Sequence, residues 1–178
     1  MYHFHRRAIL GLALVLTAAG TALAGGFYLG LQQPNAVSDP RLKGAALLVN
    51  AGGCIRGAST SLSVTAEGLV NGRRRSIPVP ATRVSSGPNH DLYAVKLKWP
   101  SEGAWLLVIH GAARHAGGGQ IHQYRLLAWE PAVWAKNAPV DLPAKTLTKR
   151  PSPQEIDRMV RALDGKKTAS ARGGRSTR

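Results

Sequence analysis

Residues 95–109, VKLKWPSEGAWLLVI, contain two hydrophobic runs separated by Pro-Ser-Glu-Gly. Apolar residues and lysines alternate over residues 93–99, which is the period-two pattern of a half-buried β-strand. Because proline cannot donate a hydrogen bond to a sheet, this strand is expected to end at Pro100, and Gly103 suits the turn that follows. Both faces of residues 105–109 are apolar, so the stretch predicts a β-hairpin at the centre of a core. The expected core residues of this hairpin are Tyr93, Val95, Trp105 and Leu107.

Similar short extended runs recur along the chain, with glycine-rich turn signals between them. They are Ala45–Asn50, Ser61–Ala66, Leu69–Val70 with Arg75–Val79, Leu92–Trp99, Ala104–Gly111, Ile121–Trp129 and a weaker run at Lys145–Lys149. This spacing, with no helix between the runs, predicts an all-β fold over residues 45–149. The expected architecture is an immunoglobulin-like antiparallel β-sandwich of about seven strands. Asp91-Leu92-Tyr93 also has the pattern of a tyrosine corner.

The runs Leu92-Tyr93-Ala94-Val95 and Trp99-Pro100-Ser101-Glu102-Gly103-Ala104-Trp105 resemble the penultimate hairpin of small bacterial extracytoplasmic immunoglobulin-like domains. The YtkA-like and FixH-like families carry a similar Y-x-V … P-x-x-G-x-W-x-L-x-V pattern, and the resemblance covers about residues 61–111. It implies the sandwich architecture and leaves the function open, because sandwiches support many functions. Some relatives with this layout handle copper through methionine and histidine clusters. Met159 is the one methionine after residue 24, which argues against transferring that function.

The N-terminus has the three parts of a secretory signal peptide, namely the basic MYHFHRR, an uncharged run, and the small-residue site at 22–24. Residues 1–24 are therefore expected to form a signal helix that is cleaved before Gly25, so that the protein is periplasmic or secreted. The alternative is an uncleaved inner-membrane anchor over residues 8–31, which could span a bilayer of about 30 Å. Residues 25–44 show little apolar periodicity and are expected to form a linker.

Ser152-Pro153-Gln154-Glu155 predicts a helix start, because it is a capping box with proline at the first helical position. Apolar residues at helical spacing follow, and Gly165 is expected to end the helix. One short amphipathic helix is thus predicted over residues 152–165, and its apolar face is expected to dock on the domain's own core. The remaining tail, residues 166–178, contains five cations and no anion and is expected to be disordered.

Without residues 1–24, the chain carries 22 lysines and arginines against 9 acidic residues, a net charge of +13. Such a balance attracts polyanions with an affinity that falls as salt rises. For an exported chain the expected partners are lipid headgroups, lipopolysaccharide, wall polymers or an envelope protein, and nucleic acid is not expected. The alternative is a basic surface without a specific partner, in which the arginines after Asn71-Gly72 are a solvated strand end. The candidate anion contacts are Arg73, Arg74, Arg75, Lys166, Lys167, Arg172, Arg175 and Arg178.

A metal site is a second hypothesis, and it rests on His110, His115 and His122. If the two flanking strands pair around a loop centred near Ala116, His110 and His122 lie opposite each other, with His115 available from the loop. Copper or zinc could then be bound. No carboxylate is close to these histidines in the sequence, and a one-residue slip in register would separate them. Structural or surface histidines are the alternative reading.

Two further chemistries are suggested by short stretches of the sequence. Gly53-Cys54-Ile55-Arg56 resembles the cysteine signature of L,D-transpeptidases, but residues 25–53 contain no histidine to activate a thiolate. The chain is therefore not expected to be an enzyme, and Cys54 is read as a small buried hydrophobe. Carbohydrate binding would use exposed indole faces, for which Trp129 and Trp134 are the candidates, with core packing as the alternative.

These patterns together predict a non-catalytic binding or scaffold module of the bacterial cell envelope that needs no cofactor and contacts an anionic surface. An extracytoplasmic copper- or zinc-binding protein is the first alternative, and a carbohydrate-binding module is the second. Membrane contact would be possible through an uncleaved N-terminal segment.

Overall fold

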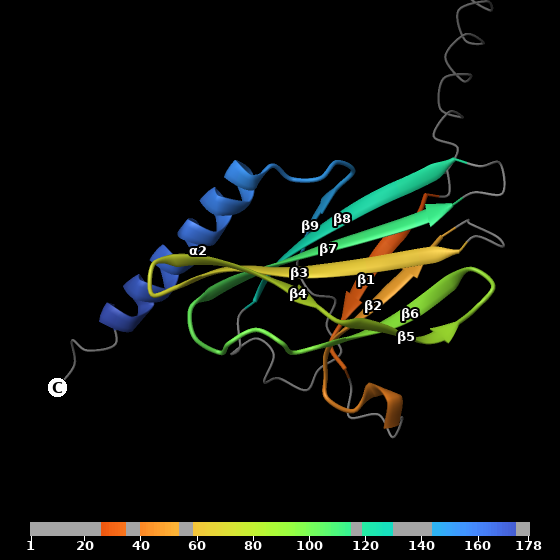
Figure 1. The fold of residues 1–178 in the computed structure, drawn as a ribbon, viewed down its shortest axis with the longest axis horizontal. Helices are drawn as coiled ribbons and strands as arrows, with labels where there is room; N and C mark the ends of the chain where they lie inside the picture. Colours follow the sequence, from red (N-terminus) through yellow and green to blue (C-terminus); the bar gives the residue numbers. More distant parts are fainter. Residues whose placement is uncertain (1–25, 35–39, 54–58, 115–118, 130–143, 174–178) are drawn as a thin grey trace, which may run out of the picture.

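Two antiparallel sheets packed face to face form the body of the protein (Figure 1). The computed structural model describes residues 26–34, 40–53, 59–114, 119–129 and 144–173, with side chains up to Lys166. The four-stranded sheet has the order β1 (Tyr28–Gln32), β2 (Ala45–Gly52), β6 (His90–Lys96), β5 (Ala81–Ser86). The five-stranded sheet has the order β4 (Arg73–Val79), β3 (Thr60–Val70), β7 (Ala104–Arg114), β8 (Gln120–Trp129), β9 (Lys145–Leu147). The predicted all-β sandwich is confirmed, with nine strands in the described part instead of about seven.

The strand order is that of an immunoglobulin-like domain. If β1 to β8 are lettered A, B, C, C′, D, E, F and G, the sheets read A-B-E-D and C′-C-F-G, with β9 as an added edge. The connection between β6 and β7 is then the E–F crossing from one sheet to the other. The predicted hairpin of these two strands is therefore wrong: β6 pairs with β2 and β5, and β7 pairs with β3 and β8.

Residues 28–32 form an edge strand of the sandwich rather than part of a linker. β1 pairs with β2 along its whole length, and the side chains of Phe27, Leu29 and Leu31 are buried in the core. These side chains cannot lie in a bilayer at the same time, so the anchor alternative over residues 8–31 is wrong for residues 27–31. The rest of that segment lies outside the described residues. No helix in the described ranges is both long and apolar enough to cross a membrane.

The linker interpretation is also wrong for the 3-10 helix η1 (Pro40–Leu42), which lies next to the four-stranded sheet. The guanidinium of Arg41 donates a hydrogen bond of 2.7 Å to the carbonyl oxygen of Val84 on β5. The Leu42 side chain packs with Leu48, Val84 and Ala94 on the face of this sheet that points away from the core. This short turn therefore covers part of the outer face.

The core between the sheets contains all four residues predicted from the sequence. Tyr93, Val95, Trp105 and Leu107 are each exposed by 5% or less. The Trp105 indole nitrogen donates a hydrogen bond of 2.7 Å to the carbonyl of Glu102, and its ring lies against Gly68 on the neighbouring strand. A Cβ atom at Gly68 would come within 2.4 Å of that ring, so β3 needs glycine at this point.

A buried polar network joins the two sheets at one end of the core. Asp91 on β6 is 5% exposed and accepts hydrogen bonds from the hydroxyls of Thr60 on β3 and Ser86 on β5. The Tyr93 hydroxyl and the Arg83 guanidinium both donate to the Thr60 carbonyl, at 3.0 and 3.1 Å. The expected tyrosine corner is therefore wrong, because Tyr93 bonds across to the other sheet and lies on the E strand rather than the F strand.

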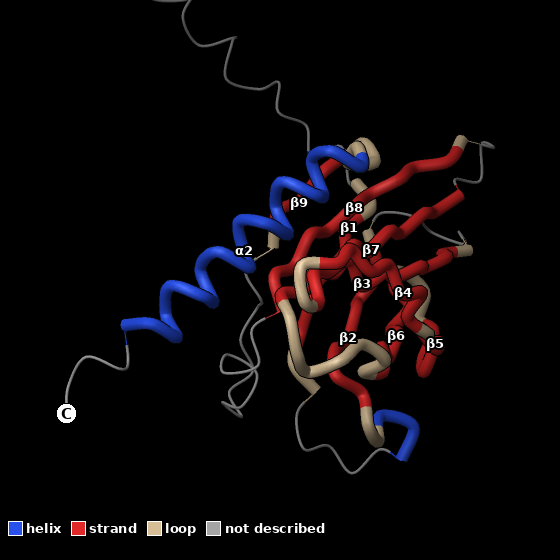
Figure 2. The backbone as a smooth tube through the Cα atoms, turned by 60° about the vertical axis from the view of Figure 1, so that its left-hand side comes forward, coloured by secondary structure: helices blue, strands red, loops and turns tan. Residues whose placement is uncertain are grey.

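The helix α2 (Pro153–Gly173) packs along the outer face of the five-stranded sheet (Figure 2). Ile156 and Val160 are buried against Leu69, Leu106 and Leu126, as expected for docking on the domain itself. The predicted end at Gly165 and the predicted tail from residue 166 are wrong as far as Gly173. A glycine in a helix costs only about 1 kcal/mol, and lysine and alanine after it favour the helix.

Candidate functional site

The β3–β4 turn places three consecutive arginines at the end of the five-stranded sheet. Asn71 and Gly72 have φ of 53° and 72°, the left-handed pair that a two-residue hairpin turn requires. Asn-Gly between two extended runs is a strong hairpin signal, and the structure forms a hairpin here, in which Arg73 pairs with Val70 to begin β4. Because side chains alternate along a strand, Arg73 and Arg75 lie on one face of β4 and Arg74 on the other.

Arg74 has a structural role. Its guanidinium lies 3.0 Å from the Glu67 carboxylate on β3 and 3.5 Å from Asp157 on α2, which ties the hairpin to the helix. Arg73 and Arg75, by contrast, are exposed. No carboxylate among the described residues lies within ion-pair distance of either one. Two of the three arginines therefore keep their charge available for an external anion.

The start of α2 confirms the predicted capping box. The Ser152 amide donates to the Glu155 carboxylate at 2.7 Å, and the Glu155 amide donates to the Ser152 hydroxyl at 3.2 Å. The hydrogen bond from the backbone amide of Ser152 is the main cause of the lowered pKa of Glu155. This cap fixes where the helix begins. The last apolar contact of the helix with the sheet is Leu163, and the residues after it extend beyond the sheet contact.

The second half of α2 extends past the β3–β4 turn and carries cations away from the core (Figure 1). Lys166 is exposed there. We call Arg73, Arg75 and Lys166 the basic end. Lys167 and Arg172 belong to α2, but their side chains are not described, and Arg175 and Arg178 lie outside the described residues. The structure thus brings two of the predicted groups of cations, far apart in the sequence, to the same end of the molecule.

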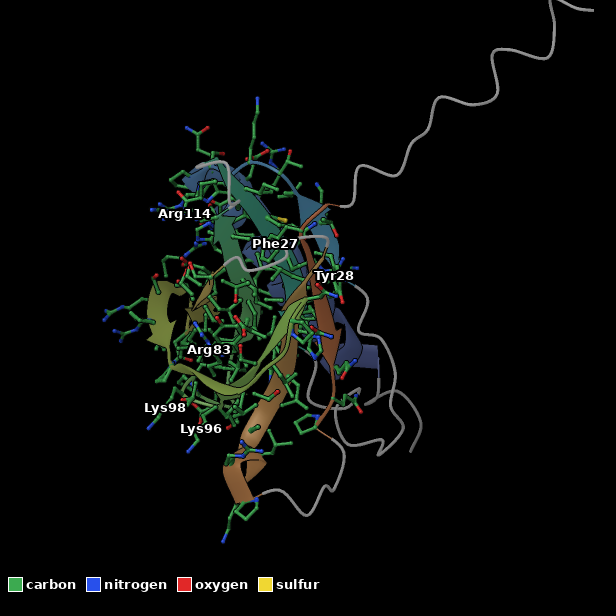
Figure 3. The ribbon with its side chains drawn as sticks, turned by 90° about the vertical axis from the view of Figure 1, so that its right-hand side faces the viewer. Phe27, Tyr28, Arg83, Lys96, Lys98 and Arg114 are labelled. Carbon is green, nitrogen blue, oxygen red and sulfur yellow. The ribbon has the colours of Figure 1, made fainter. Side chains whose placement is uncertain are left out.

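The sequence reasoning missed one exposed basic segment. Lys96 and Lys98 were read only as the polar face of a strand, but β6 ends at Lys96 and the chain then crosses to the other sheet. Leu97 between them is 50% exposed. Figure 3 shows both lysines pointing outward, far from Arg114 at the end of the molecule where Phe27 lies. The sequence could have shown this only through the start of the segment that crosses to the other sheet, because alternation does not predict burial outside a strand.

The candidate metal ligands lie on the outer face of the five-stranded sheet. The strands pair around Gly117 rather than Ala116, so His110 lies opposite Tyr124 and His122 lies opposite Ala112. The expectation that the two histidines are directly opposed is therefore wrong, but a shift of two residues keeps both on one face. They are diagonal neighbours, with His110 Nε2 at 3.0 Å from His122 Nδ1. The third candidate, His115, lies outside the described residues.

The environment of His110 favours its neutral form. Burial, the neighbouring His122 and the charge of Arg150 lower the pKa of His110 below its usual value, in that order of importance. We expect its ring-proton signals to titrate with a midpoint below 6.5. The folded state then binds fewer protons than the unfolded state, so this group stabilises the fold above that usual pKa, and the stabilisation is lost as pH falls through the lowered pKa.

Replacing Arg150 with glutamine or His122 with alanine should each raise the midpoint measured for His110. Replacing Lys149 with glutamine is the matched control, and it should leave the His110 midpoint closer to the wild-type value. A midpoint at or above the usual value, or one that neither replacement moves, would contradict this description of the site.

The remaining candidates are not brought together. Cys54, the candidate nucleophile, and Trp134 lie outside the described residues. Trp129 packs edge-on against the buried Trp99, with ring centroids 4.8 Å apart, and belongs to the rim of the core. Its ring therefore does not form the open platform that stacking on a sugar would need.

The fold and these clusters define the protein as an immunoglobulin-like β-sandwich with a helix on one outer face. Comparison of the chain with protein-family models, with curated proteins and with solved structures found no match.

Proposed function

We propose that this chain is an exported, non-catalytic binding module that contacts an anionic surface of the cell envelope through its basic end. The observation that carries the proposal is that Arg73 and Arg75 are exposed without a carboxylate partner in the described part. They lie at the same end of the molecule as the second half of α2, which adds further cations (Figure 1). The β3–β4 hairpin belongs to the five-stranded sheet, and the first half of α2 packs on the same sheet through Ile156 and Val160.

The different partners of the three arginines support this proposal. Glu67 and Asp157 engage Arg74, and Asp157 also engages Arg161 at 2.7 Å. These acids neutralise Arg74 and Arg161. They do not contact Arg73 or Arg75, which point away from the helix. An exposed anionic surface attracts each nearby lysine or arginine by about 1 kcal/mol. A few such charges acting together would give salt-sensitive binding without a pocket.

The position of β1 supports export. Phe27 is already buried, so a leader that ends before Gly25 could be removed without taking away any of the core residues that the structure describes. The first described residues lie at the other end of the molecule from the β3–β4 turn (Figure 1). A chain still held by its N-terminus would therefore present the basic end away from its own attachment point. This arrangement favours an anionic surface that lies opposite the N-terminal attachment point.

Removing charge from the basic end should weaken binding to anionic vesicles. We expect the double replacement Arg73→Gln and Arg75→Gln to lower affinity for vesicles containing phosphatidylglycerol roughly 30-fold, since two charges at about 1 kcal/mol each are lost. Deleting residues 166–178 should weaken binding further. Co-sedimentation of the chain from Gly25 onward measures both changes, and raising the salt concentration should weaken wild-type binding in the same way.

A matched control removes two exposed cations elsewhere. Arg114→Gln with Lys149→Gln changes the net charge by the same amount, but neither residue belongs to the basic end. We expect this variant to keep nearly all of the affinity. Equal losses in the two double variants would mean that net charge alone matters. A parallel arm with purified anionic wall polymer tells a headgroup from a wall partner.

A further inference from the structure

The outer face of the five-stranded sheet is only partly covered by α2. The helix covers Leu106 on β7 and Leu126 on β8. Further along the same face lie His110, four residues from Leu106 on β7, and Tyr124 and His122, two and four residues from Leu126 on β8. Two imidazoles and a phenol ring therefore gather on the part of the face that the helix contacts do not include. None of these side chains belongs to the basic end.

The two imidazoles are close enough to share one metal ion. His110 Nε2 lies 3.0 Å from His122 Nδ1. Two metal–nitrogen bonds of about 2.0–2.1 Å, meeting at roughly 90–110°, hold their nitrogen atoms about 2.9–3.4 Å apart. The observed separation falls within that interval. The two rings are stacked with planes at 18°, so both imidazoles must turn for their lone pairs to meet at one ion.

Neighbouring groups already hold the His110 ring in place. The Ser63 hydroxyl on β3 lies 3.4 Å from its Nδ1 atom, and the Tyr124 ring stacks on it with centroids 4.4 Å apart and planes at 15°. A ligating histidine commonly donates its other ring N–H to such an acceptor, which fixes the tautomer. With Nδ1–H of His110 directed to Ser63, its Nε2 atom presents a lone pair towards His122.

We propose that His110 and His122 form an exposed two-imidazole site for a divalent transition-metal ion such as Zn²⁺ or Cu²⁺. Imidazole nitrogen is a preferred ligand of these ions. In the metal-free pair, the Nδ1–H of His122 donates to Nε2 of His110. On binding, this proton leaves Nδ1 and solvent protonates Nε2 of the same ring, so both imidazoles stay neutral and each gives one lone pair to the ion.

The site is open on its outer side. In the described part of the chain, no group of three histidine, cysteine or acidic side chains is placed to hold a metal. The remaining coordination positions therefore fall to water or to an incoming ligand. Because Arg150 is close enough to lower the pKa of His110, an anionic ligand would suit these positions better than a neutral one.

A zinc titration followed by the ring-proton signals of the histidines tests the proposal. We expect one equivalent of Zn²⁺ to shift the signals of His110 and His122 before those of His90. This readout is specific to each ring, so metal taken up by Cys54 or by His3 and His5 does not imitate it. It also needs no variant that could fail to fold.

Variants then sharpen the result. His122→Ala should weaken zinc binding at His110 by at least about 10-fold, and Ser63→Ala should weaken it by about 10-fold, since removal of an outer hydrogen-bond partner has that effect. His90→Ala is the matched control and should change nothing. Signals of His110 and His122 that stay unmoved up to about 1 mM Zn²⁺ would overturn the proposal, and so would a His110 signal that shifts equally in the His122→Ala variant.

Discussion

Replacing Trp105 with alanine is expected to lower the free energy of unfolding by about 3–5 kcal/mol, the usual cost of truncating a large buried aromatic side chain. The side chain is 1% exposed and fills the space between the sheets beside Gly68. Its loss removes apolar burial, leaves a cavity and deletes the hydrogen bond to the Glu102 carbonyl. Urea unfolding followed by circular dichroism measures the change.

The control for Trp105→Ala is Leu97→Ala. Because Leu97 is 50% exposed, this replacement should lower the free energy of unfolding by less than about 0.5 kcal/mol. Gly68→Ala tests the same contact from the other strand and should also destabilise the fold, since the new methyl group meets the indole ring. A Trp105→Ala variant as stable as Leu97→Ala would show that the two sheets do not pack around this ring.

Replacing Asp91 with alanine is expected to cost about 3 kcal/mol, because hydrogen bonds to a charged group contribute about 1.5–3 kcal/mol each. The hydroxyls of Thr60 and Ser86 would both lose their acceptor. Arg83, whose side chain is 48% exposed and lies 3.8 Å from the carboxylate, would lose less, because water can solvate it. The change is measured as urea unfolding at neutral pH.

The stability of Asp91→Asn should lie between that of the wild type and that of Asp91→Ala. The amide keeps one acceptor oxygen but turns an N–H donor towards a hydroxyl. Glu102→Ala removes an exposed acid from a turn and serves as the charge-matched control, with little expected effect. If Asp91→Ala and Glu102→Ala were equally stable, the network would not be what holds β3 to the other sheet.

Most of the strands could be predicted from the sequence because they are apolar or alternating runs bounded by glycine and proline turn signals. The Asn71-Gly72 turn and the glycine near residue 117 marked both hairpins of the five-stranded sheet. β5 was missed because Val84 is its one buried side chain, so the run carries almost no alternation. β1 was missed because its apolar residues continue the uncharged run of the leader.

Contacts between distant segments could not be predicted in the same way. Periodicity shows that residues 93–99 and 105–109 are extended, but it does not say whether the chain between them turns back or crosses to another sheet. The position of His122 depended on the exact centre of a loop. Nothing in the sequence indicated that Asp157 at the start of α2 would meet Arg74 in the hairpin.

Amide hydrogen exchange with and without phosphatidylglycerol vesicles tests the proposed contact surface most directly, because it reports which part of the molecule faces the ligand. We predict slower exchange in the bound state around residues 70–75 and in the second half of α2. Exchange around residues 87–91 and 111–114 should not change. Slower exchange confined to residues 87–91 and 111–114, with the β3–β4 turn unaffected, would contradict binding through the basic end.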